Sequence, residues 1–232
     1  MSKSTNIYEI SYSLKQERRR FIQNAVFFVV VFFLALNAIL TFVICPVQQR
    51  AASMEPNVPS GTCVFATPLG RKIKRGEIII IAQNEKNLTF RQKLGDLLVG
   101  AFTFQKIRPW TSEKSLMRRA VGLPGDTLYM KDYILYVQPK DQKHFFTEFE
   151  LNQVPYSVDI SVPPAGWNPQ IGVRGSFDKI TLGENEYYVL GDNRLSCADS
   201  RLFGKVNGAN IQKRVLFSYY PLNQIKFLKF KK

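Results

Sequence analysis

The chain has 232 residues, a formal net charge of +14 and 45% hydrophobic residues. That length suits one membrane segment plus one domain of about 180 residues. Cysteines are too few for a disulfide-rich scaffold, although a Cys63–Cys197 bridge remains open. The sequence lacks the spacing of a zinc site and the aromatic motif of an RNA-binding domain, so the positive charge favours anionic lipid over nucleic acid as a partner.

An apolar run of 21 residues, 25–45, is the first feature along the chain. It contains no charged residue, and only Asn37 and Thr41 are polar. As a helix it crosses roughly 30 Å of hydrocarbon, and it is longer than the ~10–14 apolar residues of a core helix or a signal-peptide apolar region. Cys45 follows Ile44 and not the small residue that lipoprotein processing requires. The run therefore predicts an uncleaved transmembrane helix.

The charges that flank this run differ on its two sides. Residues 1–20 carry five cations, whereas the stretch 46–69 carries only Arg50. The positive-inside rule predicts that residues 1–24 are cytoplasmic and that residues 46–232 form an extracytoplasmic domain at the cell membrane. The C-terminal sequence KFLKFKK alternates cations with apolar residues, as a segment that binds anionic lipid does, and the alternative is a solvated basic surface.

Beyond the apolar run the pattern is mostly β. Runs of β-branched and aromatic residues bounded by glycine, proline or other turn residues predict strands. These runs are 76–83, two strands within 127–138 around a turn at Lys131–Asp132, 186–193 and 213–220. Residues 84–113 have mixed polarity and leave room for a short helix. Residues 139–180 are rich in proline and glycine and predict a loop-rich insertion.

Four short stretches of the predicted domain combine polar and turn residues. Each alone has an ordinary explanation, such as a type II turn at Pro124–Gly125 or a surface ion pair between Asp199 and Arg201. Together, in this order behind an N-terminal anchor, they resemble the type I signal peptidases from the anchor to about Val206. The four are SMEP (53–56), RGEIIII (75–81), RRAVGLPGD (118–126) and GDNRLSCADSR (191–201).

This resemblance implies a mainly β fold, with a catalytic domain of antiparallel sheets of the signal peptidase I type behind one transmembrane helix. It implies a serine endopeptidase of the peptidase S26 family that cleaves signal peptides from exported preproteins after small residues. No metal or organic cofactor is implied. The implied site has Ser53 as the nucleophile, Arg118 at the base position, and Met54 and Met117 at the pocket for the small residue. Asp192, Asp199 and Arg201 are implied to hold the loop of residues 191–201, called the late loop below.

Three residues depart from the family pattern. Arg118 stands where the family has a lysine base, and guanidinium, with a pKa above ~12, does not take a proton from a serine. A lysine does so once burial lowers its pKa from ~10.4 toward ~7–8. Cys197 replaces the serine that helps to position the lysine. Ala51 replaces an oxyanion-hole hydroxyl found in some members, which leaves the main-chain N–H of Ser53 as the donor.

These departures leave three explanations open. The chain is an inactive relative, natural or engineered; an active peptidase that uses another lysine; or a binder of signal peptides or partner peptidases without chemistry. Lys114 shares a face with Arg118 in an extended segment, but at ~3.3 Å per residue it lies ~13 Å away, too far for direct proton transfer unless the segment bends. His144, the single histidine, lies in the insertion, and a Ser–Lys dyad does not need it. Cleavage is the first hypothesis and binding without cleavage the alternative.

Overall fold

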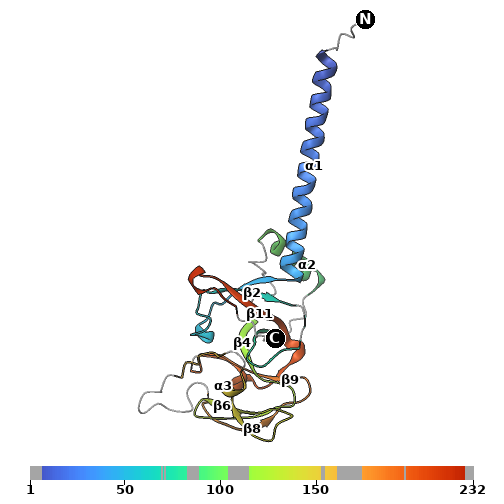
Figure 1. The fold of residues 1–232 in the computed structure, drawn as a ribbon. Helices are drawn as coiled ribbons and strands as arrows, with labels where there is room; N and C mark the ends of the chain where they lie inside the picture. The colour runs from blue at the N-terminus through green and yellow to red at the C-terminus, as the bar shows by residue number, and fades with distance from the viewer. Residues whose placement is uncertain are drawn as a thin grey trace.

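A computed structural model describes residues 7–68, 70, 72–82, 89–103, 115–152, 155–160, 174–195 and 197–227. A long helix, α1 (Ile7–Phe42), projects from a β-rich domain (Figure 1). Its stretch Lys15–Leu40 is long and apolar enough to cross a membrane. Phe28 and Phe32 are each 68% exposed, so α1 is not packed as a core helix of the domain.

The larger sheet is antiparallel and, in the described part of the chain, has eight strands. Their order is β1-β2-β11-β3-β4-β9-β10, with β12 paired to β11. Since β1 begins three residues after α1 ends, the helix joins the sheet at its edge strand. The strands are β1 (Cys45–Gln48), β2 (Cys63–Thr67), β3 (Ile78–Ala82), β4 (Ser115–Gly122), β9 (Glu186–Leu190), β10 (Val206–Asn207), β11 (Ile211–Tyr220) and β12 (Lys226–Phe227).

A second antiparallel sheet lies at the end of the domain opposite α1 (Figure 1). Its order is β7-β6-β5-β8, with β5 (Thr127–Lys131), β6 (Ile134–Gln138), β7 (Phe146–Thr147) and β8 (Phe177–Thr181). The turn between β5 and β6 has positive φ at Asp132 and Tyr133, 51° and 65°, as a two-residue hairpin turn of type I′ requires. The turn predicted at Lys131–Asp132 is therefore one residue too early, because Lys131 still pairs with Ile134.

Short helices connect the strands. They are η1 (Ala52–Met54), α2 (Phe90–Phe102), α3 (Glu148–Leu151), α4 (Ser200–Phe203), η3 (Gly208–Asn210) and η4 (Leu222–Gln224). The helix predicted within 84–113 is α2, which begins with a capping box formed by Thr89 and Gln92. Within the predicted insertion, α3 lies between β7 and a described segment at 155–160.

The isoleucine run of β3 shows why the domain is held together around this strand. Ile78 and Ile80 belong to one buried cluster, and Ile79 and Ile81 to another on the opposite face of the sheet. Successive side chains of a strand point to opposite faces, so a strand covered on both sides is apolar at every position. A third buried cluster joins β4 and β9 to the smaller sheet through residues such as Val121 and Leu128.

The structure confirms the predicted fold class, a mainly antiparallel β fold preceded by one apolar helix. Three predicted strands have different ends: β3 begins at Ile78, two residues later than predicted, β9 stops at Leu190, because Gly191 begins the late loop, and β11 begins two residues earlier than predicted. The apolar helix ends at Phe42, and Cys45, predicted as its last residue, begins β1. Cys63 and Cys197 are both free thiols, so the bridge left open by the sequence does not form.

Candidate active site

Ser53 lies in η1, the short turn between β1 and β2, and only 4% of its surface is exposed. Its main-chain carbonyl accepts a hydrogen bond from the N–H of Asn193 at 3.2 Å. A side chain at Gly191 would place its Cβ 2.7 Å from that carbonyl oxygen and would clash with Sγ of Cys197. The late loop therefore packs directly against the Ser53 turn, and glycine at 191 makes this contact possible.

Arg118 reaches Ser53 from β4, 65 positions away in the sequence. Its Nη1 donates to Ser53 Oγ at 2.9 Å and to the carbonyl of Met117 at 2.5 Å. Its Nε and Nη2 both donate to the carbonyl of Ala198, at 2.9 Å and 2.7 Å. Burial lowers the pKa of Arg118 from its ordinary value, but a guanidinium stays a cation at neutral pH. Arg118 is thus a buried donor aimed at the serine oxygen.

Gln49 is a second donor to the same oxygen, and no pattern in the sequence had pointed to it. The side chain is 6% exposed, and its Nε2 donates to Ser53 Oγ at 3.2 Å and to the carbonyl of Ala51 at 2.7 Å. A polar residue just after a strand is ordinary in a sequence. The close return of the chain from β1 through η1 gives Gln49 its contact with Ser53.

The Ser53 hydroxyl is therefore surrounded by donors. In the described part of the chain, its oxygen has Arg118 and Gln49 as hydrogen-bond partners, and neither side-chain nitrogen accepts a proton. The two donors occupy the lone pairs that a nucleophilic attack uses. His144 is exposed in the loop before β7, and Lys114 lies outside the described residues.

Cys197 is not the missing base. It is 4% exposed, and burial raises the pKa of its thiol to about 12. At neutral pH the group is a protonated thiol, which has no charge with which to draw the proton from Ser53. Cys197 lies against Gly191 instead, so the two residues pack against each other within the late loop.

Asp199 and Arg201 hold the late loop in place from inside. Arg201 Nη2 lies 2.8 Å from Oδ2 of Asp199, and both side chains are fully buried. Asp199 also accepts the N–H of Gly191 at 3.1 Å, and Arg201 donates to the carbonyl of Arg194 at 2.7 Å. The pair is therefore an internal support of the loop and not a surface ion pair.

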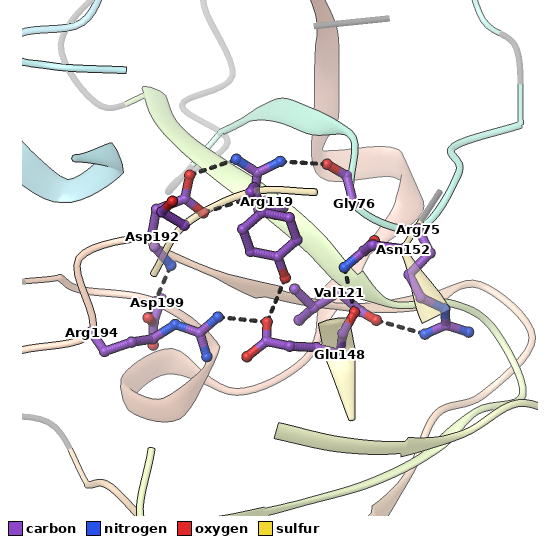
Figure 2. A network of polar contacts seen from close by, with 12 residues as sticks. Arg75, Gly76, Arg119, Val121, Glu148, Asn152, Asp192, Arg194 and Asp199 are labelled. Atoms are coloured by element: carbon purple, nitrogen blue, oxygen red, sulfur yellow. Dashed lines mark hydrogen bonds and ion pairs between the residues drawn. The ribbon is translucent and has the colours of Figure 1, made fainter. Parts of the chain in front are cut away.

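Asp192 connects three separate segments next to the site. It is fully buried and accepts two hydrogen bonds from Arg119, at 2.7 Å and 2.5 Å, and one from Asn57 at 2.8 Å. Arg119 also donates to the carbonyl of Gly76 at 2.7 Å, and Figure 2 shows its guanidinium between Gly76 and Asp192. Asp192 thereby fastens β4 and the turn that follows Ser53 to the late loop.

The predicted insertion contributes a second part of this buried network. Glu148, on α3, lies 2.6 Å from Nη2 of Arg194 and accepts the hydroxyl of Tyr156 at 2.5 Å (Figure 2). The ring of Tyr156 lies 3.9 Å from the guanidinium carbon of Arg119. Burial, and then the nearby Glu148, raise the pKa of Tyr156 well above its ordinary value, so its hydroxyl stays a donor. The sequence did not single out Glu148 or Tyr156.

Met54 and Met117 are brought together by the fold. Both belong to the buried cluster that contains Val58, Ile78 and Ile80, and they are 0% and 5% exposed. In the sequence, Met54 directly follows Ser53 and Met117 directly precedes Arg118. Their assignment to a pocket for a small substrate residue remains a prediction.

These contacts bury Ser53 and hold its surroundings in place through buried polar side chains. Among the described residues, its hydroxyl has two donors and no proton acceptor as hydrogen-bond partners. Among the residues that the structure describes, no group of three or more histidine, cysteine or acidic side chains is placed to hold a metal. The described side chains of the site can donate hydrogen bonds, from Arg118 and Gln49, toward an oxygen at or near Ser53.

Comparison with known proteins places the chain in a family. A model of the signal peptidase family, peptidase S26, matches residues 21–220. Signal peptidase I of Bacillus licheniformis is 26% identical over 207 residues, which cover 87% of this chain and 89% of that protein. Signal peptidase IB of Staphylococcus aureus strain MRSA252 is 23% identical over 207 residues, which cover 86% of this chain and 90% of that protein. A crystal structure of a signal peptidase I from Enterococcus faecalis is 21% identical and covers 62% of this chain and 97% of its own. Its TM-score of 0.30 is too low to support the family assignment. The family match spans the apolar helix, the Ser53 turn and the late loop, and the chain belongs to the signal peptidase family, peptidase S26.

Proposed function

We propose that the chain binds the signal peptides of exported preproteins at the Ser53 site and, with Arg118 in place, does not cleave them efficiently. The observation that carries this proposal is the 2.9 Å hydrogen bond from Arg118 Nη1 to Ser53 Oγ. A serine hydroxyl becomes a strong nucleophile when a neighbouring base removes its proton. Here the residue at the base position gives a hydrogen bond to the oxygen and takes none.

Peptide binding does not depend on that proton transfer. In β4, pairing with β9 begins at Arg119, so residues 115–117 pair with β3 alone among the described strands. This half-paired segment leads directly to Arg118 and the Ser53 turn. An extended peptide adds to such an edge through main-chain hydrogen bonds, with alternate side chains giving specificity. Met54 and Met117 are then the residues we assign to the small side chain before the cleavage position.

Cleavage by the unmodified chain is the second candidate, and one specific observation favours it. Ser53 is retained, buried to 4% exposure and held at hydrogen-bond distance from the residue at the base position. Such a serine needs only a proton acceptor to act. Lys114 is the residue that this candidate assigns to the role.

Arg118→Lys separates the two candidates. An ammonium group that loses solvent on burial can lose its proton, whereas guanidinium cannot, so we expect the lysine variant to gain cleavage of a model preprotein. General-base catalysis contributes about 10²–10⁴-fold in rate, which sets the scale of the gain. Adding Cys197→Ser supplies a hydroxyl partner for the lysine, and we expect the two changes to be non-additive. The measurement is the cleavage rate of the full chain in nanodiscs, with signal-peptide affinity measured in parallel.

Two controls make the result specific. Arg118→Met removes the donor without supplying a base, so it should gain no cleavage, and Ser53→Ala in the Arg118→Lys background should abolish the gained activity. Efficient cleavage by the unmodified chain, unchanged by Arg118→Lys, would overturn the proposal. So would the absence of signal-peptide binding by a folded chain.

We further propose the membrane arrangement that the charges indicate. The apolar part of α1 crosses the cell membrane, residues 1–24 are cytoplasmic and residues 46–232 lie outside, because the five cations that precede the apolar run oppose translocation. Anionic lipid is a fitting partner for a domain of this net charge, whereas nucleic acid is not expected on that side. Reporter tags on the two termini check the orientation: both reporting the cytoplasm would contradict it.

A further inference from the structure

Helix α2 presents an apolar stripe that the domain does not cover. Phe90, Leu94, Leu98 and Phe102 are 77%, 46%, 51% and 77% exposed. A spacing of four residues turns by about 40° at each step, so the four side chains lie within roughly 120° of the helix surface. Asp96, on the opposite side, is 5% exposed. The helix therefore turns its acidic residue toward the protein and its large apolar residues away from it.

The end of this stripe touches the apolar helix. The rings of Phe102 and Phe33 have centroids 6.3 Å apart, and Figure 1 shows α2 beside the end of α1 that joins the domain. Phe33, Leu36, Asn37 and Leu40 are partly or fully buried, at the spacing of one helix face. Residues between them, such as Leu34 at 61% exposure, are open. One face of α1 is thus covered at this level and the rest is exposed.

This contact sets a depth for α2. Phe33 precedes Leu40, the end of the stretch able to cross a membrane, by seven residues. At 1.5 Å per residue, Phe33 lies about 10 Å inside the end of that stretch. Helices that lie in a membrane interface place their apolar face about 5–10 Å into the boundary between head groups and acyl chains. Phe102 is therefore at the depth expected for such a helix.

We propose that α2 lies in the outer interface of the bilayer that α1 crosses, with Phe90, Leu94, Leu98 and Phe102 in contact with lipid acyl chains. The contact of α2 with α1 favours lipid as the partner of the apolar stripe, because lipid surrounds a membrane-spanning helix and any helix held against it within the bilayer. Arg91, exposed at the start of α2, has a long stem that lets its guanidinium reach the head groups while the neighbouring rings stay in the apolar layer.

The consequence is a second attachment of the domain to the membrane. The first is the covalent one, from α1 into the edge strand β1, which leads to Gln49 and the Ser53 turn. A single attachment leaves a domain free to swivel, whereas two fix its orientation. The Ser53 site is then held at a constant height above the bilayer. This inference rests on the proposed insertion of α1, but it requires no catalytic activity.

Photochemical crosslinking tests the inference on the full chain. p-Benzoyl-phenylalanine is introduced singly at Leu94 or Leu98, and the protein is irradiated in nanodiscs of phosphatidylcholine and phosphatidylglycerol. Phe28, 68% exposed on α1, is the positive control for insertion. Phe149, 43% exposed on α3 at the opposite end of the domain, is the matched control (Figure 1). Intact-mass measurement then reports whether the adduct is lipid or protein.

We expect lipid adducts at Phe28, Leu94 and Leu98 and none above background at Phe149. Lipid adducts at Phe28 but not at the two α2 positions would overturn the assignment of α2 and leave the insertion of α1 standing. Adducts from Leu94 and Leu98 to a second protein copy would also overturn it, since the stripe would then be a protein interface. Absence of lipid adducts at all four positions would refute the insertion of α1, and the inference about α2 with it.

Discussion

Arg118 and Arg119 are neighbours on β4, both almost fully buried, yet their surroundings differ. Their side chains point to opposite faces of the sheet, as successive strand residues do. Arg119 is paired through two hydrogen bonds with the buried carboxylate of Asp192. Among the described residues, the oxygens that accept hydrogen bonds from Arg118 are the neutral ones of Ser53, Met117 and Ala198. Arg119 is thus a buried cation neutralised by a carboxylate, whereas Arg118 is a buried cation that lies beside the candidate nucleophile.

The pKa shifts follow this difference. Burial lowers the pKa of Arg118, and the nearby Cys197 and Asp199 only partly offset that effect. Burial also acts to lower the pKa of Arg119, but the charge and hydrogen bonds of Asp192 outweigh it and the pKa is raised. A buried cation without a hydrogen-bonded carboxylate is costly to keep, so we expect that Arg118 can be exchanged with less damage to the fold than Arg119. Arg119 and Asp192 are a pair that must be kept together.

Arg119→Leu gives the largest expected effect. Removing one partner of a buried ion pair leaves an uncompensated charge, here on Asp192, and costs about 3–5 kcal/mol of the free energy of unfolding. Arg118→Leu leaves no carboxylate without a partner, so its loss should be less than half as large. The measurement is the thermal unfolding midpoint of both variants in the same detergent. Equal lowering by the two substitutions would contradict the distinction between the neighbouring arginines.

Tyr156→Phe gives a smaller effect and tests whether the insertion stabilises the buried network around Arg119. The change removes one hydrogen bond to the Glu148 carboxylate and keeps the ring over Arg119, so we expect a loss of about 1.5–3 kcal/mol in the free energy of unfolding. Lys205→Ala, which breaks an exposed ion pair with Glu186, is the control and should change little. If both variants unfold at the midpoint of the unmodified chain, the Tyr156 hydroxyl does not stabilise the network.

Local patterns in the sequence predicted several elements well. The apolar run, the β-branched run of β3 and the hairpin of β5 and β6 follow from periodicity and turn residues over a few positions. The motif order pointed to the family, and that assignment is confirmed. Gln49 escaped prediction because its role depends on where its amide points after the chain turns, and a glutamine carries no local signal for that.

The residue types of the site can be read without any structure: a serine is present, an arginine stands at the base position and a cysteine at the supporting position. Guanidinium cannot act as a base in any fold, so the residue type alone shows that Arg118 is not a base. Three contacts, by contrast, became known from the folded chain: Arg118 donates to Ser53, Arg119 turns away to Asp192, and the stripe of α2 meets α1. The reason is that side-chain alternation and helix periodicity are local, whereas the partners across 65 or 73 positions are chosen by strand pairing and packing of the whole chain.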